Sequence, residues 1–286
     1  VPISLKQTWE ETAVAPAFTG LLNESYGSGA AAAYSTRRLN GNYTGACMTI
    51  RRASDSTTTT IGFSSEDIDE SAITTFCTGT TCTVVTWHDQ SQTGGTGSGN
   101  DATAASTGVE PTIYTGGAIV KESGKLALEF SSDSFTLDSS ITTNPLCLFS
   151  MHIDTSNSYF PLRDGTTDYV WFHTSYGQLR ARMGGTFAID NYTSKGTMGL
   201  RSFIKKGTSG NEALNYVDGV NITTSGYSTL DTETGTFTTL GAYTGKSQEV
   251  LVYTSDKSTD RTSIESNVGD YFTQNTPLLD TYTGAA

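Results

Sequence analysis

Residues Asn215–Ile222 read NYVDGVNI, and this stretch decides the fold class. Asp-Gly stands between two apolar runs, the strongest short-range signal for a β-hairpin, because these residues accept the positive φ angles of a two-residue turn. A hairpin of this kind joins antiparallel strands. The stretch therefore predicts an antiparallel sheet.

Short apolar runs separated by turns recur along most of the chain. CLFSMHI (Cys147–Ile153) and QEVLVYT (Gln248–Thr254) are two examples, and the runs follow one another at about 10 to 15 residues without long helices between them. The composition agrees, since Thr and Ser are abundant and there are 30 Gly among 286 residues. We expect an all-β fold, with antiparallel sheets packed as a sandwich or jelly roll. FTTLGAY (Phe237–Tyr243) and QEVLVYT are expected to form separate strands.

Two segments change to a helical period. In EDIDESAITTFC, Asp69 can cap a short helix with Ile73 and Phe76 on one face. In SDKSTDRTSIESNVGDYF, Ser258 or Thr259 can cap a second helix. Its apolar residues repeat at helical spacing and are Ile264, Val268, Tyr271 and Phe272. We expect this closing helix to lie across the edge of one sheet.

The charge pattern argues against two classes of partner. The formal net charge is −12 and the acidic residues are scattered, so the surface repels nucleic acid and anionic lipid. No stretch reaches the roughly 18 apolar residues of a membrane-spanning helix. The chain begins on Val rather than Met, which we interpret as a fragment or a processed product.

The ends of the chain predict three segments. Residues 1–20 lack a clear period and are expected to be an arm or linker, 21–274 the sandwich, and 275–286 a second linker. PLLDTYTGAA (Pro277–Ala286) resembles LLNESYGSGAA (Leu21–Ala31), so the second linker can be the lead-in to another copy of the domain. There are two alternatives: the similarity of the two phrases is a coincidence, or the C-terminal segment docks on a neighbouring subunit.

The four cysteines leave two interpretations open. Cys77 and Cys82 stand at the ends of a four-residue Gly/Thr turn, where a local disulfide is sterically easy. A disulfide would place the protein outside a reducing cytosol, and two buried thiols are the alternative. Whether Cys47 and Cys147 pair stays open. A zinc site is disfavoured because the three histidines, His88, His152 and His173, stand at no suitable spacing.

Three phrases carry a family resemblance: AYSTRRLNGNYTGACMTIRRASDSTTTTIGF (Ala33–Phe63), FCTGTTCTVVTWHDQS (Phe76–Ser91) and GNDAT (Gly99–Thr103). They resemble the concanavalin A-like, laminin-G-type β-sandwich domains of bacteriophage virion proteins. More distantly, they resemble the catalytic sandwich of family 54 α-L-arabinofuranosidases. The resemblance implies a concanavalin A-like jelly roll with one or two short helices, and a disulfide between Cys77 and Cys82.

The chemistry of the arabinofuranosidases carries over less well. A retaining glycosidase needs two carboxyl groups about 5 Å apart. The phrase that corresponds to the nucleophile strand, DYVWFHTSYG, offers only Asp168, at its start. The phrase that corresponds to the acid/base loop, LGAYTGKSQE, has Gly245, Lys246 and Ser247 instead of an Asp. The resemblance therefore implies that both positions are vacant, and we assign no catalytic residue.

The remaining candidate sites are weighed against structural roles. In WHDQS, His88 and Asp89 are neighbours on a strand and point to opposite faces, so Asp89 and Gln90 are interpreted as hydrogen-bond partners of the long loop 91–101. His152 and His173 are interpreted as core or interface histidines. A glycan site requires an exposed aromatic with polar neighbours, and the candidates are Tyr169, Trp171, Tyr176, Arg163 and Asp164.

No cofactor is specified by the sequence. Calcium is conceivable in a laminin-G-like sandwich, and the carboxylates available for it are Asp89, Asp101, Asp154 and Asp164. No spacing selects among them, so we predict no metal site.

These observations lead to one main prediction and two alternatives. We expect a non-enzymatic structural or adhesion module of a virion surface structure, such as a tail fibre, spike or capsid decoration. Its expected partners are other virion subunits in a homo-oligomer and a host glycan, at the virion surface or outside the cell. One alternative is a secreted arabinofuranosidase-like hydrolase that uses Asp168 with Glu129 or Glu249. The other is a subunit of a self-assembling extracellular fibre.

Overall fold

The computed structural model describes residues 18–272, apart from 93–98, 156–158, 166, 174–177, 192–197, 208–212, 224–229 and 231. The predicted C-terminal linker and all but the last three residues of the predicted arm lie outside this part. Within it, strands dominate, as the all-β prediction requires, and the α-helices are α1 (Glu70–Phe76) and α2 (Arg261–Tyr271). In the part described, no helix is both long and apolar enough to cross a bilayer.

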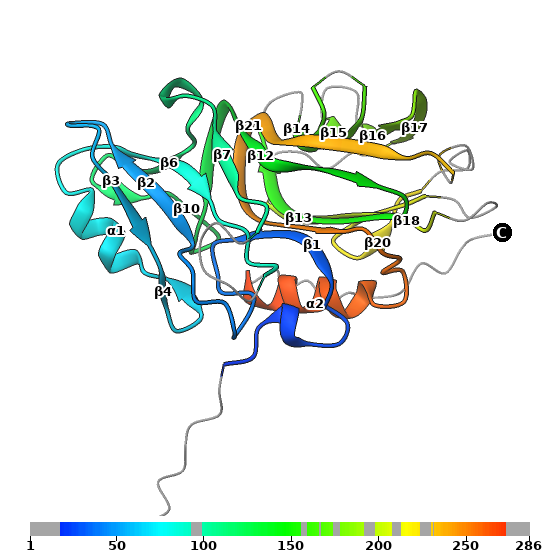
Figure 1. Cartoon of the computed structure of the whole chain (residues 1–286), viewed down its shortest axis with the longest axis horizontal. Helices are drawn as coiled ribbons and strands as arrows, with labels where there is room; N and C mark the ends of the chain where they lie inside the picture. Colours follow the sequence, from blue (N-terminus) through cyan, green and yellow to red (C-terminus); the bar gives the residue numbers. More distant parts are fainter. Residues whose placement is uncertain are drawn as a thin grey trace, which may run out of the picture.

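Two antiparallel sheets face each other in Figure 1 and form the sandwich. The lower sheet has the order β1 (Ala30–Ser35), second half of β21 (Gly235–Tyr253), β13 (Leu146–Asp154), β18 (Gly199–Lys205), β19 (Leu214–Val217) and β20 (Val220–Asn221). The upper sheet has the order β12 (Leu128–Thr143), first half of β21, β14 (Tyr159–Arg163), β15 (Tyr169–His173), β16 (Gln178–Met183) and β17 (Thr186–Asn191).

A smaller lobe extends the upper sheet on the left of Figure 1, where β7 and β8 pair with β12. Its strands are β2 (Met48–Arg52), β3 (Thr58–Ile61), β6 (Cys82–Trp87), β7 (Ala102–Ala104), β8 (Thr112–Thr115) and β9 (Ala118–Ile119). Two short hairpins flank it: β4 (Phe63–Ser64) with β5 (Asp67–Ile68), and β10 (Lys121–Glu122) with β11 (Lys125–Leu126). Two 3-10 turns are η1 (Leu21–Asn23) and η2 (Thr107–Val109).

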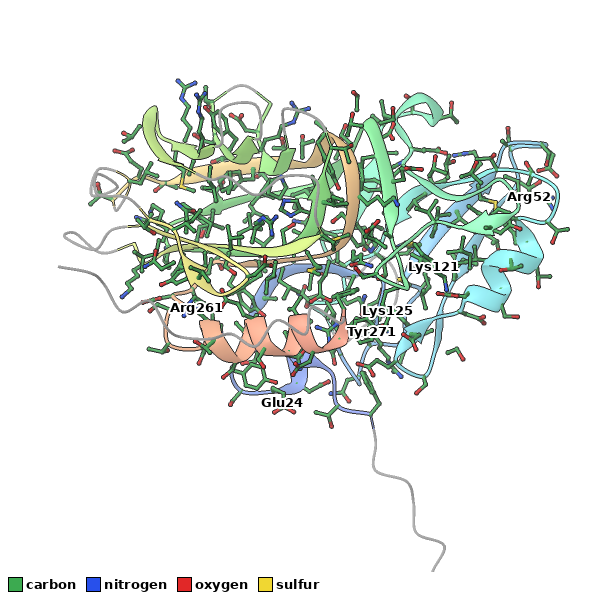
Figure 2. All side chains as sticks on the ribbon, turned by 180° about the vertical axis from the view of Figure 1, so that it is seen from behind. Glu24, Arg52, Lys121, Lys125, Arg261 and Tyr271 are labelled. Atoms are coloured by element: carbon green, nitrogen blue, oxygen red, sulfur yellow. A yellow bond between two sulfur atoms is a disulfide. The ribbon has the colours of Figure 1, made fainter. Side chains whose placement is uncertain are left out.

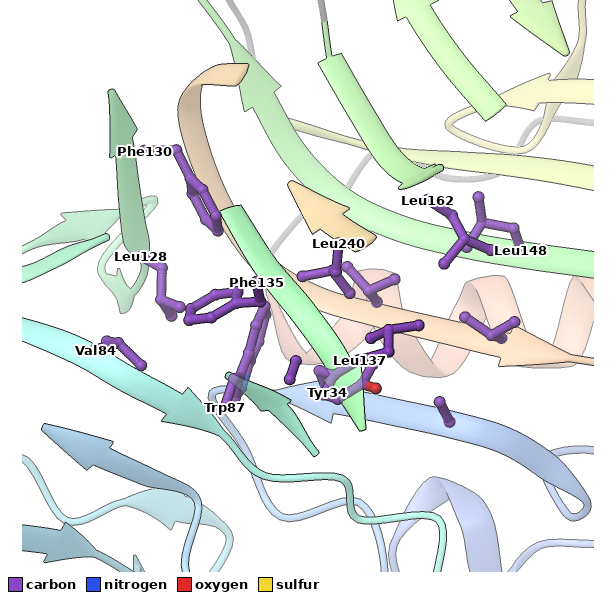
Figure 3. Packing of buried hydrophobic residues seen from close by; sticks show 14 of the residues in the cluster. Tyr34, Val84, Trp87, Leu128, Phe130, Phe135, Leu137, Leu148, Leu162 and Leu240 are labelled. Carbon is purple, nitrogen blue, oxygen red and sulfur yellow. The ribbon is translucent and has the colours of Figure 1, made fainter. Parts of the chain in front are cut away.

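The two faces of the lower sheet bury different clusters. On β13, Leu148 points into the sandwich, whereas Phe149 and Met151 belong to a second cluster on the outer face. This is the two-residue alternation of a strand that is covered on both sides. The first cluster continues into the lobe around Trp87, whose ring lies near Tyr34 and Phe135 (Figure 3). One continuous core therefore joins the lobe to the sandwich.

The outer face of the lower sheet is covered by α2. Ile264 and Val268 are buried against the second cluster, with Phe272 directly after the helix. The prediction that this helix crosses a sheet edge is therefore wrong: it lies under a face, as Figure 1 shows. The predicted cap is also wrong, because Asp260 occupies the N-cap position and its side chain makes no capping hydrogen bond.

Strand β21 corrects the prediction of two separate strands at its position. It runs for 19 residues, pairs with β12 in its first half and lies between β1 and β13 in its second. The phrase LGAYTG suggests a turn because Gly241 and Ala242 have φ of +95° and +71°. These angles produce a bulge, at which the register with β12 shifts, and the strand bends from one sheet to the other.

Three locally encoded features are present as predicted. Asp69 caps α1 by accepting a hydrogen bond from the Ala72 amide at 2.9 Å. Asp218 and Gly219, with φ of +48° and +80°, form the turn between β19 and β20. Cys77, at the end of α1, forms a disulfide with Cys82, at the start of β6. Each feature depends on residues close in sequence.

The other two cysteines do not pair. Cys47 and Cys147 are buried free thiols, and burial raises the pKa of Cys147 to about 12 and that of Cys47 further. The Cys47 thiol donates to the Ser35 carbonyl, and Cys147 sulfur accepts from the Lys257 amide. Both therefore behave as small core residues rather than reactive groups.

Candidate active site

The predicted glycan site is only partly described by the structure. Arg163 and Tyr169 lie opposite each other on β14 and β15, and the Asp164 carboxylate accepts hydrogen bonds from the Thr167 amide and hydroxyl. Asp164 is thus a turn residue. The Trp171 side chain and all of Tyr176 lie outside the described residues.

The surroundings of Tyr169 are cationic. Its Cα pairs with that of Arg182, and Arg180 is also near enough to stabilise a phenolate. Burial nevertheless dominates and raises the pKa of the Tyr169 hydroxyl. The hydroxyl therefore remains protonated at neutral pH. The structure brings together Arg163, Asp164 and Tyr169, but the predicted aromatic platform stays a prediction.

His88 of the WHDQS phrase belongs to a buried polar network. Its Nδ1 lies 2.7 Å from Asp101 Oδ2, and its Nε2 lies 2.9 Å from Thr49 Oγ1. Asp89 does not bond to His88, in agreement with the opposite faces predicted for them. The Asp89 amide instead donates to Asp101 Oδ1 at 2.8 Å. His88 thus fixes the strand that follows the loop.

Asp89 closes the two ends of the long loop. Its carboxylate accepts amide hydrogen bonds from Ala33, Ser91 and Asn100 at 2.7, 2.9 and 2.8 Å. Gln90, which was expected to serve the same loop, bonds instead to the segment after β1, through the Leu39 amide and the Arg37 carbonyl. The structural interpretation of Asp89 and Gln90 holds, with a different partner for Gln90.

The calcium candidates are not assembled into a metal site. Asp89, Asp101 and Asp164 direct their oxygens to protein hydrogen-bond donors, as described above, and the Asp154 side chain lies outside the described residues. Across the part of the chain that the structure describes, no three His, Cys, Asp or Glu side chains are grouped to hold a metal ion.

The carboxylates proposed for a shifted catalytic pair have structural roles. Asp168 is buried, and its oxygens accept the amides of Gly184 at 3.0 Å and Thr236 at 2.8 Å. Glu249 is also buried, with both oxygens bound to Arg37. Thr236 and Glu249 lie on opposite sides of the bend in β21 and hence in different sheets. Asp168 and Glu249 therefore do not form a pair.

A different carboxyl group lies at the bend of β21. Asp133 of β12 pairs with Tyr243, and its side chain is buried at 9% exposure. Burial raises the pKa of Asp133, although the Ser131 amide, which donates to its Oδ2 at 2.6 Å, acts in the opposite direction. The Tyr243 ring stacks on Phe130 at a centroid distance of 4.5 Å. Asp133 thus sits beside an aromatic pair at the end of the sandwich.

Two further acidic positions flank the same bend. Glu129 pairs with Lys246 on one side of β21, and Asp154 pairs with Gly245 on the other. The phrase LGAYTGKSQE, which lacks the expected Asp, is therefore bordered by acids from neighbouring strands. From the sequence, Glu129 was a possible partner of Asp168 and Asp154 a calcium candidate. Their common position beside this bend was not predicted, because the register between strands about 100 residues apart cannot be read from a chain without knowing its pairing.

A polar group also lies inside the sandwich on the lower sheet. His152 is fully buried and its Nδ1 lies 3.0 Å from Ser150 Oγ, while Arg201 pairs with Ser150 on the adjacent strand. Burial and the Arg201 charge lower the pKa of His152 well below 6.5, so the ring is neutral. His152 is a core histidine, as predicted. The His173 side chain lies outside the described residues.

Two facing antiparallel sheets joined by a bent strand, with a helix under the outer face, form an all-β sandwich whose fold is similar to that of a GH54 α-L-arabinofuranosidase. The family described as alpha-L-arabinofuranosidase B, catalytic, matches residues 22–129. None of the curated proteins compared with the chain matches it.

Solved structures extend the likeness beyond the matched segment. A GH54 α-L-arabinofuranosidase soaked with a cyclic sulfate inhibitor is 18% identical with a TM-score of 0.57, over 84% of this chain and 62% of its own. An arabinofuranosidase complexed with arabinofuranosyl-α-1,2-xylobiose is 19% identical with a TM-score of 0.54, over the same shares. At this identity the likeness establishes the fold. The chain spans less than two thirds of these proteins.

These comparisons correct the main functional prediction. The expectation of a non-enzymatic virion surface module is wrong, because the family that matches residues 22–129 is one of catalytic domains. Of the two resemblances drawn from the sequence, the more distant one, to the family 54 sandwich, is the one supported. Absence of the family's carboxylates from DYVWFHTSYG after Asp168 and from LGAYTGKSQE before Glu249 does not outweigh this match.

Proposed function

We propose that the chain is an arabinofuranosidase-like glycoside hydrolase domain, acting on α-L-arabinofuranosyl groups of a glycan. The observation that carries the proposal is the match of residues 22–129 to a family of catalytic domains, in a chain that has the same fold as two arabinofuranosidases. Loss of the family's acid/base position does not exclude hydrolysis if another strand supplies the acid.

Asp133 has the properties of that acid. Glycoside hydrolysis needs a carboxyl group that is protonated at working pH so that it can donate to the leaving oxygen. Burial raises the pKa of Asp133, which is the usual way in which proteins prepare a carboxylic acid for this task. Its Cα partner is Tyr243, which belongs to LGAYTGKSQE, the phrase that by resemblance corresponds to the family's acid/base loop.

The second carboxyl group is expected from the other side of β21. Glu129 immediately precedes Phe130, so it points to the opposite face of β12 from the Phe130 ring that stacks on Tyr243. That makes Glu129 a poor partner for Asp133. Asp154, whose backbone pairs with Gly245, is two residues along β21 from the partner of Asp133. We propose Asp154 as the nucleophile or base.

The proposed location is outside the cell. The Cys77–Cys82 disulfide joins two neighbouring elements, α1 and β6, and such bonds persist in oxidising compartments. A glycan-degrading activity at the same location would meet its polymeric substrate directly.

The test compares two leaving groups. The full chain is assayed with 4-nitrophenyl α-L-arabinofuranoside and with an arabino-oligosaccharide, whose leaving oxygen needs a proton whereas 4-nitrophenolate leaves without one. Asp133→Asn is expected to lower kcat on the oligosaccharide by about 100-fold or more, and on the nitrophenyl glycoside much less. Asp154→Asn is expected to lower both.

Asp138→Asn is the matched control, because Asp138 lies on the same strand β12 and is exposed. It should leave both rates unchanged. Absence of arabinose release by the unmodified chain would refute the function. If Asp133→Asn cleaves the oligosaccharide at the full rate, the chain is a hydrolase but Asp133 is not its general acid.

A further inference from the structure

Three neighbouring strands of the upper sheet carry a row of cross-strand partners. Arg163 of β14 pairs with Tyr169 of β15, which pairs in turn with Arg182 of β16. Directly paired residues of an antiparallel sheet point to the same side. Because adjacent strands lie about 4.8 Å apart, Tyr169 stands between two arginines whose backbones are separated by about 10 Å. Figure 1 shows the three strands side by side at the top of the molecule.

The side chains of this row point away from the core. Their neighbours along the strands belong to the hydrophobic cluster inside the sandwich and are Leu162, Val170 and Ala181. Successive side chains of a strand alternate between the two faces of a sheet, so the row lies on the outer face. All three of its residues are accordingly only half-buried.

A third arginine joins the row. Arg180 lies two residues before Arg182 on β16, so it points to the same side and is also half-buried. The charges of Arg180 and Arg182 both act on the Tyr169 hydroxyl, where they oppose the rise in its pKa. The whole chain is acidic, with a formal net charge of −12. This face therefore concentrates positive charge on an acidic protein.

Two acids near the row are held by other donors. Asp168, directly before Tyr169, is buried, and its oxygens accept two backbone amides. Asp164 lies beside Arg163, but its carboxylate accepts the amide and hydroxyl of Thr167. Burial lowers the pKa of Arg163, and the Asp164 charge offsets only part of this effect. An anion bound from solvent would therefore stabilise the Arg163 guanidinium.

An acidic sugar matches both the ring and the charges of the row. A sugar presents C–H groups to an aromatic face, and a carboxylate or sulfate on it accepts parallel hydrogen bonds from a guanidinium. A neutral sugar would leave the partly desolvated Arg163 charge without compensation. Nucleic acid fits less well, because its closely spaced phosphates, about one per 1.7 Å in a duplex, are repelled by the acidic remainder of the chain.

We propose that an acidic polysaccharide binds to this arginine face, which consists of Arg163, Tyr169, Arg180 and Arg182. The Tyr169 ring stacks on a sugar ring, and the arginines on either side bind the carboxylate or sulfate groups of that sugar and the next. The inference rests on the proposed glycan-cleaving function, because it names the class of polymer to which the arabinosyl groups are attached.

The position of the arginine face agrees with this function. Arg163 also pairs with Thr239 of β21, and Thr239 is four residues before Tyr243, the partner of Asp133. A polymer bound to the arginine face therefore lies beside the strand whose bend carries the proposed acid.

The test measures binding of matched probes to the full chain by titration calorimetry. The probes are an oligogalacturonate, its fully methyl-esterified form, a sulfated oligosaccharide and a single-stranded oligonucleotide with the same number of charges. Esterification keeps the sugar rings and removes the charges. We expect an acidic oligosaccharide to bind at least tenfold more tightly than both the ester and the oligonucleotide. Comparison of the oligogalacturonate with the sulfated probe identifies the anionic group.

Two pairs of variants localise the binding. Arg182→Gln removes one cation and should weaken binding of the acidic probe by about tenfold, whereas Arg182→Lys keeps the charge without the planar fork and should lose less. Tyr169→Ala should also weaken binding by about tenfold, whereas Tyr169→Phe keeps the ring and should bind as the unmodified chain does. Urea unfolding of each variant checks that it is folded.

Arg52→Gln is the matched control. It removes the same charge from a side chain that is 30% exposed in the small lobe, on the right of Figure 2, away from the arginine face. It should leave the affinity unchanged. Equal binding of the ester, tighter binding of the oligonucleotide, or equal losses in Arg52→Gln and Arg182→Gln would overturn the proposal.

The two proposals fail in different ways. If the acidic probe binds and Arg182→Gln weakens its binding, but the unmodified chain releases no arabinose, the catalytic function fails and the binding face stands. If the chain cleaves nitrophenyl arabinofuranoside but binds the acidic probe no better than its ester, the binding face fails and the catalytic function stands.

Discussion

Arg37 and Glu249 form a bidentate ion pair inside the protein. Nε lies 2.8 Å from Oε2 and Nη2 lies 3.1 Å from Oε1, and the two side chains are 4% and 1% exposed. Ser35 Oγ also donates to Oε2, at 2.6 Å. Glu249 belongs to the last strand and Arg37 to the segment after the first, so the pair fastens the two ends of the domain beneath Tyr271.

Removal of one partner of this pair should be costly. Glu249→Ala leaves the Arg37 guanidinium buried without its counter-charge, and we expect the free energy of unfolding to fall by about 3–5 kcal/mol. The control is Asp55→Ala, which breaks the Arg52–Asp55 pair with side chains 30% and 47% exposed, and should change the free energy of unfolding far less. Urea unfolding followed by tryptophan fluorescence measures both. Equal losses in the free energy of unfolding would show that the buried pair contributes no more than the exposed one.

The bend of β21 depends on Gly241. Its φ is +95°, and a Cβ at this position would lie 3.0 Å from Phe130 Cε1 and 3.1 Å from the Asp133 carbonyl oxygen. We expect Gly241→Ala to reduce stability by about 1–3 kcal/mol and, under the proposed function, to lower the rate of arabinose release through displacement of Asp133. Gly62→Ala is the control, since nothing lies within 4 Å of its added Cβ. If Gly241→Ala is as stable as the unmodified protein, this account of the bend is wrong.

His152 should make stability depend on pH below neutrality. Folding lowers its pKa from the ordinary 6.5, so the folded state binds fewer protons than the unfolded state. As the pH falls through 6.5, the unfolded state takes up the proton, and stability decreases by up to about 1.4 kcal/mol per pH unit. His152→Asn removes the titration and keeps an amide near Ser150 Oγ. We expect unfolding curves of the two proteins to diverge below pH 6.5 and to run parallel above it. Parallel curves throughout would mean that His152 has the same pKa in the folded and unfolded states, which contradicts a pKa lowered by burial.

The Cys77–Cys82 bond should stabilise the junction of α1 and β6. In the chain-entropy description, closing so short a loop contributes about 2 kcal/mol. The double variant Cys77→Ala, Cys82→Ala should therefore unfold at lower denaturant concentration than the oxidised protein. Addition of a reductant should lower the midpoint of the unmodified protein alone. A reductant effect on the double variant would point to another cause.

Local signals in the sequence predicted the local structure. The Asp69 cap, the Asp218–Gly219 turn and the pairing of Cys77 with Cys82 each involve groups at most five residues apart, so no tertiary information was needed. The all-β class followed from the same kind of evidence repeated along the chain.

Features that depend on distant partners were not predictable in this way. The sequence around Gly241 is compatible with a turn, but the structure has one continuous strand there. A β-bulge and a chain reversal favour the same kinds of residue, so the sequence alone does not distinguish them. The interpretation of His88 was right, but its partner Asp101 became visible only with the fold. Asp133 received no attention because nothing in the sequence brings it opposite Tyr243.

The uninterrupted course of β21 through both sheets has a mechanical consequence. The two layers share one strand, so neither layer can separate from the other without straining hydrogen bonds in both. Heat or force that disrupts one layer is therefore transmitted to the other through a continuous backbone, and the whole domain should unfold in one cooperative transition.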